Sequence, residues 1–381
     1  MTDGVLRRRP DGAAEAFLPT HTVQSHAANL ALLPDGSLGC VWFGGTQEGM
    51  ADIGIWFSRL PAGGDRFTDP VPLSDDPHRS EQNPVLFVAP DGELWLLHTA
   101  QHAGDQDTAV VRVRRSATSG REWTPTEDLI SSDEGGVFVR QPPVVLPSGR
   151  WLLPTFTCRR VGDRPWTGDH DISSVRCASS WQETLVPEST GLVHMNITPR
   201  IGGYVAYFRS RWADHVYRSV CGEDGVSWQP PRPTELPNNN SSIQAVKLDD
   251  GRTVMALNAS SRRTATARRV SLYDEIDDNG IVEGAGPQVL PVDDTGERTA
   301  FWGAPRAPLI LAVSHDDGVT WPVRHSLANG DGYALSNNSR DGRNRELSYP
   351  SILPDGGGGL HIAFTHHRKA IRYLHLPTVP S

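Results

Sequence analysis

The chain has 381 residues, and 36 lysines and arginines against 45 aspartates and glutamates give it a net charge of −9. A general nucleic-acid binder carries a basic surface, so this balance predicts no nucleic-acid partner. No apolar run reaches the roughly 18 residues that a membrane-spanning helix needs. The polar segment Met1–Pro10 also lacks the apolar stretch of a secretory signal. We therefore expect no membrane partner and a cytoplasmic location.

Glycine and proline are frequent, with 37 and 30 residues, and much of this content falls in one recurring turn. The turn lies between short apolar runs at Leu33–Gly36, Ala89–Gly92, Leu146–Gly149, Leu248–Gly251 and Leu353–Gly356. Proline fixes its φ angle and glycine supplies a positive φ, so such a segment predicts a β-hairpin. The spacings are 56, 57, 102 and 105 residues, and a weaker turn at Arg200–Gly203 divides the first long gap. The pattern indicates six repeated units.

Each unit reads as a four-stranded blade, and helix signals are almost absent. We predict a single all-β domain, a six-bladed β-propeller with blades at residues 26–75, 80–133, 138–190, 192–236, 238–330 and 346–377. The fifth blade carries an insertion at residues 262–300 that is rich in Asp, Glu and Gly. The sixth blade has only three apolar runs. We expect residues 14–19 to supply its fourth strand and close the ring.

A second repeat also favours the propeller. The segment Ser314–Trp321 matches the Asp-box pattern Ser-x-Asp-x-Gly-x-Thr-Trp, and Ser116–Trp123 and Cys221–Trp228 are degenerate copies. An Asp-box closes the turn between the third and fourth strands of a blade. Its Asp and Ser bind the turn backbone, its Gly adopts a left-handed conformation and its Trp packs beneath. These residues predict the fold and say little about function.

The first strand of each propeller blade lines the central channel, so polar residues where these strands begin should meet at one mouth. Such residues occur in all six units and include His26, Asn83, Arg140, His194 and Tyr349. The second strands add further polar residues, namely His98, Arg209 and Arg211. We expect a polar site at the mouth of the channel. For His98, which ends a strongly apolar run, a structural role in the core is the competing interpretation.

On these motifs the chain resembles the sialidase-like (BNR/Asp-box) propeller superfamily over nearly its whole length. Arg209 and Arg306 match two of the three arginines with which sialidases hold a carboxylate, and Tyr349 matches their nucleophilic tyrosine. The first arginine is missing from the segment Ser25–Asn29, and the glutamate that activates the tyrosine has no counterpart near His194. Without that carboxylate a tyrosine is a poor nucleophile, because it stays protonated at neutral pH.

Histidine, tyrosine, arginine and amide side chains suit β-elimination at a uronic acid. Arginine neutralises the carboxylate as the carbanion forms, and histidine or tyrosine transfers the protons. Within the superfamily the sequence is similar to the rhamnosyl-(α1,4)-glucuronate lyase-like branch. The likeness rests on His78 with His98, the segment that begins at His26, the segment Trp42–Thr46, and Arg209. It implies an exo-acting polysaccharide lyase that releases L-rhamnose.

The same resemblance implies roles for individual residues. His98 would be the acid/base catalyst and His78 would assist it, with Tyr349 and Arg209 completing the catalytic set. The substrate-binding residues would be His26, Asn83, Arg140, His194, Arg211 and Arg306.

Two other functions stay open. Arg209, Arg306 and Tyr349 would also fit a sialidase-like exo-glycoside hydrolase, either a sialidase or a rhamnosidase, and a non-catalytic glycan-binding propeller is the third possibility. We expect no cofactor, because the four cysteines lack metal-ligand spacing. A divalent cation held by the entrance histidines is an open alternative. The expected partner is an oligosaccharide or polysaccharide side chain, and the expected state is a monomer.

Overall fold

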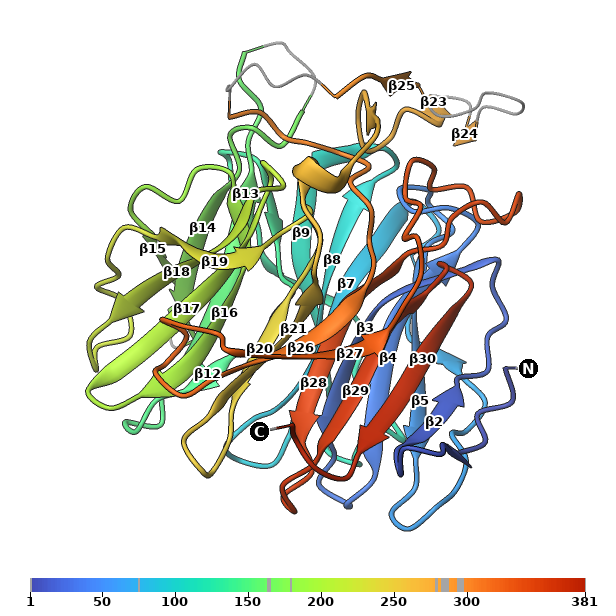
Figure 1. The fold of residues 1–381 in the computed structure, drawn as a ribbon, viewed down its shortest axis with the longest axis vertical. Helices are drawn as coiled ribbons and strands as arrows, with labels where there is room; N and C mark the ends of the chain where they lie inside the picture. The colour runs from blue at the N-terminus through green and yellow to red at the C-terminus, as the bar shows by residue number, and fades with distance from the viewer. Residues whose placement is uncertain are drawn as a thin grey trace.

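The computed structural model of the chain describes residues 2–74, 76–162, 166–178, 180–277, 280–281, 288–292 and 298–380. Six antiparallel sheets of four or five strands form the body of the molecule (Figure 1). Each sheet is one blade, and the innermost strands of neighbouring blades pack against one another around the axis. The six-bladed β-propeller predicted from the sequence is therefore confirmed.

The first three blades follow one another along the chain. Blade 1 consists of β3 (Gln24–Leu32), β4 (Leu38–Gly45), β5 (Gly54–Leu60) and β6 (Val71–Pro72). Blade 2 consists of β7 (Arg79–Val88), β8 (Leu94–His102), β9 (Asp105–Ser116) and β10 (Glu127–Ile130). Blade 3 consists of β11 (Gly136–Phe138), β12 (Val144–Val145), β13 (Trp151–Cys158), β14 (Ile172–Cys177) and β15 (Gln182–Leu185).

The last three blades complete the ring. Blade 4 consists of β16 (Leu192–Arg200), β17 (Gly203–Ser210), β18 (His215–Cys221) and β19 (Arg232–Pro237). Blade 5 consists of β20 (Gln244–Lys247), β21 (Thr253–Asn258), β26 (Leu309–Ser314) and β27 (Val323–Ala328). Blade 6 consists of β28 (Leu347–Pro354), β29 (Leu360–His366) and β30 (Ala370–Leu376), followed by β2 (Ala14–Phe17) and β1 (Arg7–Arg8).

The N-terminal strand β2 joins the two ends of the chain within blade 6. It pairs antiparallel with β30, and the register sets Ala14 opposite His375 and Phe17 opposite Arg372. Without β2, the backbone groups of β30 would form an open sheet edge. The last blade is thus built from both termini of the sequence.

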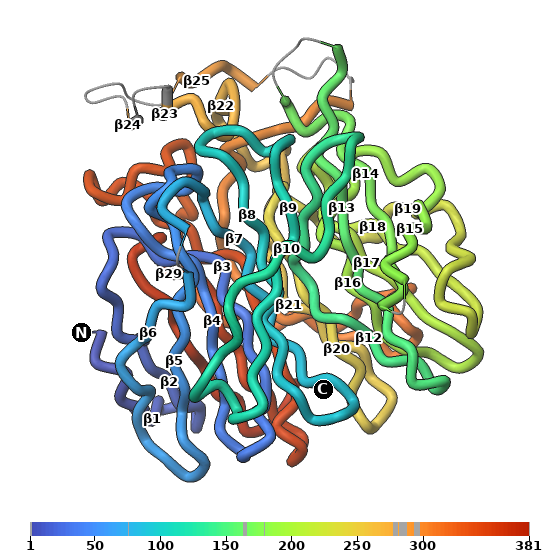
Figure 2. Tube along the Cα trace, turned by 180° about the vertical axis from the view of Figure 1, so that it is seen from behind, coloured from blue at the N-terminus to red at the C-terminus, as the bar shows by residue number. Residues whose placement is uncertain are grey.

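The insertion of blade 5 lies between β21 and β26. It contains the 3-10 helix η1 (Arg262–Thr264) and four two-residue strands, β22 (Arg268–Arg269), β23 (Ile276–Asp277), β24 (Gly280–Ile281) and β25 (Val289–Leu290). These strands lie together at one end of the propeller, at the top of Figures 1 and 2. Residues 278–279, 282–287 and 293–297 of the predicted insertion lie outside the described residues.

The apolar core lies between neighbouring blades. One cluster joins Tyr207 and Val216 of blade 4 to Leu257 and Trp321 of blade 5. Trp321 ends the Asp-box, in which the Gly318 amide donates to Ser314 Oγ at 2.8 Å. The Asp-box therefore closes its own turn and also seals the contact between two blades. In the described part of the chain, no helix is long and apolar enough to cross a membrane.

Candidate active site

Four inner strands share a β-bulge near the point where they begin. The pairing register of β3, β7, β16 and β28 shifts there. At each bulge one non-glycine residue has a left-handed backbone, with φ values of 59° at Ala27, 50° at Asn83, 54° at His194 and 52° at Tyr349. A bulge redirects a side chain, and such strain clusters at functional sites. Three of these residues, Asn83, His194 and Tyr349, line one cavity.

This cavity is narrow, with a volume of about 20 Å³, and is lined by residues from blades 1 to 6 and from the insertion. Its polar lining includes three guanidinium groups, those of Arg209, Arg211 and Arg306, but only one carboxylate, that of Glu48. Leu272 of the insertion also belongs to its wall. The described lining is therefore rich in positive charge and polar groups.

Tyr349 lies at the centre of these charges. The guanidinium carbons of Arg140, Arg209 and Arg306 are 5.3, 5.6 and 5.6 Å from the centre of its ring. The imidazole of His26 packs on the same ring, with 4.3 Å between ring centres, and that of His194 follows at 5.8 Å. Negative charge that develops near the phenol would be stabilised electrostatically by the guanidinium groups.

Arg209 holds the Tyr349 phenol directly. Its Nη1 donates to the Tyr349 hydroxyl oxygen at 2.6 Å, its Nε donates to Asn240 Oδ1 at 2.8 Å, and the Nε2 of His194 is 3.4 Å away. No carboxylate among the described residues forms an ion pair with Arg209. Burial lowers the pKa of Arg209 to about 10, which leaves it charged at neutral pH. A buried positive charge without an anionic partner is costly unless a ligand supplies that partner.

The other two arginines that line the cavity, and Arg368 beside it, have carboxylate partners. Arg306 pairs with Glu346 at 2.7 Å, and Arg368 pairs with Glu346 at 2.8 Å and with Glu48 at 2.6 Å. Burial opposes the ionisation of Glu346, but Arg368 and Arg306 hold its pKa below the ordinary value. Arg211 pairs with Asp171 at 2.7 Å. Arg209 is thus the cavity arginine that lacks such a partner among the described residues.

The two central histidines are neutral at neutral pH. Burial lowers the pKa of His194 well below its ordinary value, and Arg209 and Arg211 lower it further. Burial and Arg368 lower the pKa of His26 in the same way. The Nδ1 of His194 has no hydrogen-bond partner among the described residues. A neutral imidazole has one ring nitrogen without a hydrogen, and that nitrogen can accept a proton.

The structure gathers eight of the ten residues that the sequence suggested. Six line the cavity, namely Asn83, His194, Arg209, Arg211, Arg306 and Tyr349. His26 and Arg140 lie against the ring of Tyr349. The donors of Arg140 go to protein groups, including the carbonyl oxygens of Ala28 at 3.0 Å and Ala27 at 3.3 Å. Arg140 is thus hydrogen-bonded to the backbone, where we expected a substrate contact.

The structure does not bring His98 or His78 to the cavity. His98 is fully buried within blade 2, where its Nε2 lies 3.0 Å from Glu81, which also pairs with Arg112 at 3.1 Å. His78 is exposed just before β7, and its backbone amide donates to Asp76. We therefore do not place these two histidines among the groups that can reach a substrate in the cavity.

Several groups at the cavity had no assigned role. Arg368 lies in the turn after β29 and has a φ angle of 52°. The ion pair between Arg368 and Glu48 connects blades 6 and 1. Gln82 and Gln106 add amides to the wall. The polar start of β7 signalled Gln82, whereas nothing in the sequence predicts that Leu272 reaches the cavity from an insertion. No group of three or more His, Cys, Asp or Glu residues within the described ranges is placed to hold a metal ion.

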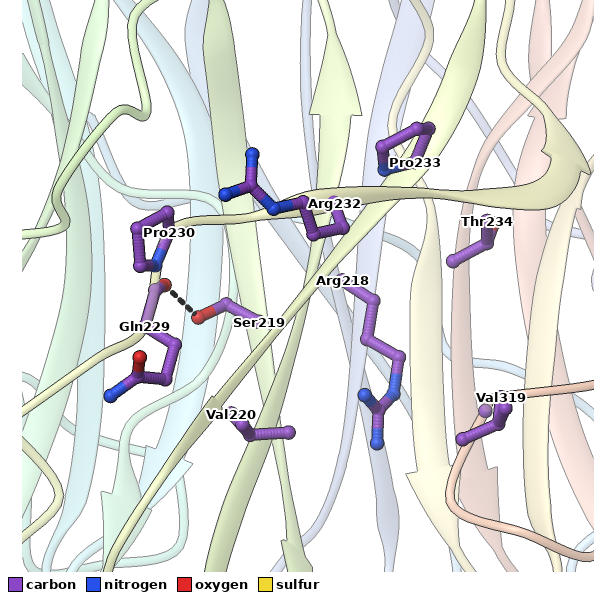
Figure 3. Close-up of a pocket in the computed structure, with 10 residues that line it drawn as sticks. Arg218, Ser219, Val220, Gln229, Pro230, Arg232, Pro233, Thr234 and Val319 are labelled. Carbon is purple, nitrogen blue, oxygen red and sulfur yellow. Dashed lines mark hydrogen bonds between the residues drawn. The ribbon is translucent and has the colours of Figure 1, made fainter.

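A second cleft lies at the outer edge of the propeller, between blades 4 and 5 (Figure 3). It carries Arg218, Arg232, Ser219 and Thr234. Both hydroxyl groups donate to backbone carbonyl oxygens, those of Gln229 and Val216. Arg218 donates to the carbonyl of Asp317. With its hydroxyl groups engaged by the backbone, this cleft lacks the convergent reactive groups of the central cavity.

The fold and the cavity define a six-bladed propeller with a polar site at one mouth of its channel. Residues 36–362 match the model of the BNR repeat-like domain, and the chain belongs to this family. The sialidase-like superfamily indicated by the sequence is thereby confirmed. No protein with a curated description matches the chain in sequence.

Solved structures share the fold at low sequence identity. A protein of unknown function from Dyadobacter fermentans has a TM-score of 0.67 at 13% identity, covering 100% of this chain and 98% of its own. The Hadza microbial sialidase Hz136 has a TM-score of 0.65 at 13% identity, with coverages of 93% and 66%. Trypanosoma rangeli sialidase in complex with the inhibitor DANA has a TM-score of 0.62 at 9% identity, with coverages of 98% and 58%. The chain thus spans about two thirds or less of the length of these two sialidases.

Proposed function

We propose that the protein is an exo-acting carbohydrate-active enzyme whose substrate carries a carboxylated sugar. The main support is the environment of Arg209. This residue lines the cavity beside Tyr349 and has no carboxylate partner among the described residues. A guanidinium group matches the planar carboxylate geometry with two parallel donors. The similarity of fold to proteins described as sialidases supports a glycan substrate.

The reaction that these groups support best is β-elimination at a uronic acid. In this proposal Arg209 and Arg306 neutralise the substrate carboxylate, and neutral His194 removes the adjacent proton from carbon 5. The bond from carbon 4 to the glycosidic oxygen then breaks, Tyr349 protonates that oxygen, and a double bond forms between carbons 4 and 5. For a rhamnosyl-(α1,4)-glucuronate end, the released sugar is L-rhamnose. His194 here takes the role that we first gave to His98.

A sialidase-like hydrolase is the second candidate, because Arg209, Arg306 and Tyr349 all line one cavity. Hydrolysis through a tyrosine nucleophile needs a base that activates the phenol. The described hydrogen-bond partner of the Tyr349 hydroxyl is Arg209, a donor. This arrangement favours elimination over hydrolysis.

The test uses a rhamnosyl-(α1,4)-glucuronate oligosaccharide and a sialoside reporter. We expect L-rhamnose release together with the ultraviolet absorbance of an unsaturated uronate. Release without that absorbance would establish hydrolysis, and binding without turnover of either glycan would establish a binding module.

Arg209→Met should lower the rate of L-rhamnose release by roughly 10²- to 10³-fold, because a buried donor to the developing charge is lost. The control is Arg232→Met at the outer cleft, where the side chain is 74% exposed. That variant should keep wild-type activity. Equal activity of the two variants would contradict the role of Arg209.

A further inference from the structure

A larger pocket adjoins the central cavity on the side of the blade 5 insertion. Its volume is about 600 Å³, against about 20 Å³ for the central cavity. Leu272 lines both spaces, so the two are neighbours. Trp166, Trp302 and Tyr273 give the outer pocket three aromatic side chains. The outer pocket is therefore large enough for more than one sugar unit, directly beside the proposed reaction site.

The wall between the two spaces is held firmly. The hydroxyl of Tyr273 accepts from Gln106 Nε2 at 2.9 Å and from Gln101 Nε2 at 3.2 Å, and Gln106 itself lines the central cavity. Glu275, two residues further on, accepts from Ser336 Oγ at 2.6 Å and from the amide of Asn337 at 2.7 Å. These bonds fix the insertion against blade 2 and against the segment before blade 6.

Arg211 links the outer pocket to the central cavity. Its guanidinium carbon is 5.4 Å from the ring centre of Trp166 and 5.1 Å from that of Trp302, while Arg211 itself lines the central cavity. The carboxylate of Asp171 accepts from Arg211 Nε at 2.9 Å and from Trp166 Nε1 at 2.8 Å. One buried carboxylate thus positions both the cationic group of the inner space and an aromatic ring of the outer one.

Two charged groups of the outer pocket, Arg160 and Asp169, have polar partners within the protein. Arg160 pairs with Asp105 at 3.1 Å and with Asp107 at 2.6 Å. Asp169 accepts from Thr167 Oγ1 at 2.6 Å and from the amide of Ala300. Aromatic faces with paired polar groups suit a neutral sugar, whose apolar ring face stacks while its hydroxyl groups form hydrogen bonds.

We propose that the outer pocket is a binding subsite for a neutral sugar linked to the carboxylated sugar in the central cavity. The enzyme then recognises at least a disaccharide, and the blade 5 insertion provides the second half of the recognition site. This inference rests on the proposed function, because it takes the central cavity as the site of the carboxylated sugar.

Binding is measured by titration calorimetry in a Tyr349→Phe background, which prevents turnover. The probes are glucuronic acid alone, rhamnosyl-(α1,4)-glucuronate and glucuronosyl-galactose. We expect at least one disaccharide to bind more tightly than glucuronic acid. Trp166→Ala should weaken that disaccharide by roughly three- to tenfold and glucuronic acid clearly less, because Asp171 still holds Arg211. Trp166→Phe keeps an aromatic face and should retain most of the affinity.

The control for loss of a tryptophan is Trp95→Ala, in blade 2, where Trp95 stacks on Arg115 away from both spaces. Thermal melting verifies that each variant is folded. Disaccharides that bind no more tightly than glucuronic acid, or a Trp166→Ala variant that weakens both equally, would overturn the subsite. Failure of glucuronic acid to bind at all, with no change in Arg209→Met, would instead overturn the proposed function.

Discussion

Arg140 illustrates how one buried side chain can serve the architecture of a site without facing the substrate. It comes from blade 3, yet its donors reach the carbonyl oxygens of Ala27 and Ala28 in blade 1 and of Tyr349 in blade 6. Two of these residues are the left-handed bulge residues, whose carbonyl groups depart from the regular strand ladder. Burial lowers the pKa of Arg140 to about 10, so its charge persists at neutral pH.

Arg140→Met should therefore lower the free energy of unfolding by about 3 kcal/mol, because several buried carbonyl oxygens lose their donor. Arg140→Lys keeps a charge and some donors, and its loss should be smaller. Urea denaturation measures both. If Arg140→Met keeps the wild-type stability but no longer binds the sugar, Arg140 has the substrate-binding role that we first predicted for it.

His98 shows why the sequence misplaced part of the site. Side chains of a β-strand alternate between its two faces, and in a second propeller strand these faces meet the neighbouring blades. Leu96 packs in the cluster with blade 1, while Leu97 packs in the cluster with blade 3. His98 follows this alternation and ends beside Glu81. When a polar residue ends an apolar run, the sequence does not predict whether its side chain faces a neighbouring blade or the channel.

The repeated turns and the Asp-box made the fold predictable, because their residues act locally. In the Asp-box, Asp316 accepts from the Thr320 amide at 2.9 Å and Gly318 has a φ angle of 78°. The sequence did not predict the bulges, because no residue type is common to their left-handed positions, Ala27, Asn83, His194 and Tyr349. Their position follows from strand pairing between distant residues, and the wall formed by Leu272 depends on long-range packing of an insertion.

Gly318→Ala tests how strongly the Asp-box depends on close packing. A Cβ at this position would lie 2.3 Å from the hydroxyl of Tyr207, in addition to the strain of a positive φ. Gly251→Ala is the matched control, since its φ angle is 88° and nothing lies within 4 Å of the added Cβ. Both should lose about 1 kcal/mol through backbone strain, and Gly318→Ala roughly 1–3 kcal/mol more. Equal losses in thermal or urea unfolding would contradict the packing argument.

The propeller as a whole buries many ionisable groups, and this couples its stability to pH. Burial and neighbouring histidines lower the pKa values of His361 and His366 from 6.5 to about 4. The unfolded chain therefore takes up protons as the pH falls below 6.5, before the folded chain can do so. Glu81 and Glu346, whose pKa values are also lowered, act in the same direction at lower pH.

We expect the melting temperature to fall progressively between pH 6.5 and pH 4, with the folded state most stable above this window. A His361→Gln, His366→Gln double variant removes two of the titrating groups, so its melting temperature should depend less on pH. Scanning calorimetry across the window measures both proteins. Parallel pH curves for the two would show that these histidines do not control acid stability.

The bulge shared by four inner strands sets where a side chain is placed, whatever the residue type at that position. Because three of the four left-handed bulge residues line the cavity, the bulge gives different strands equivalent positions for a side chain. Asn83, His194 and Tyr349 occupy these positions with an amide, an imidazole and a phenol, while Ala27, at the fourth bulge, packs in an apolar cluster. A propeller built this way can exchange one reactive group for another by single substitutions, with its blades left unchanged.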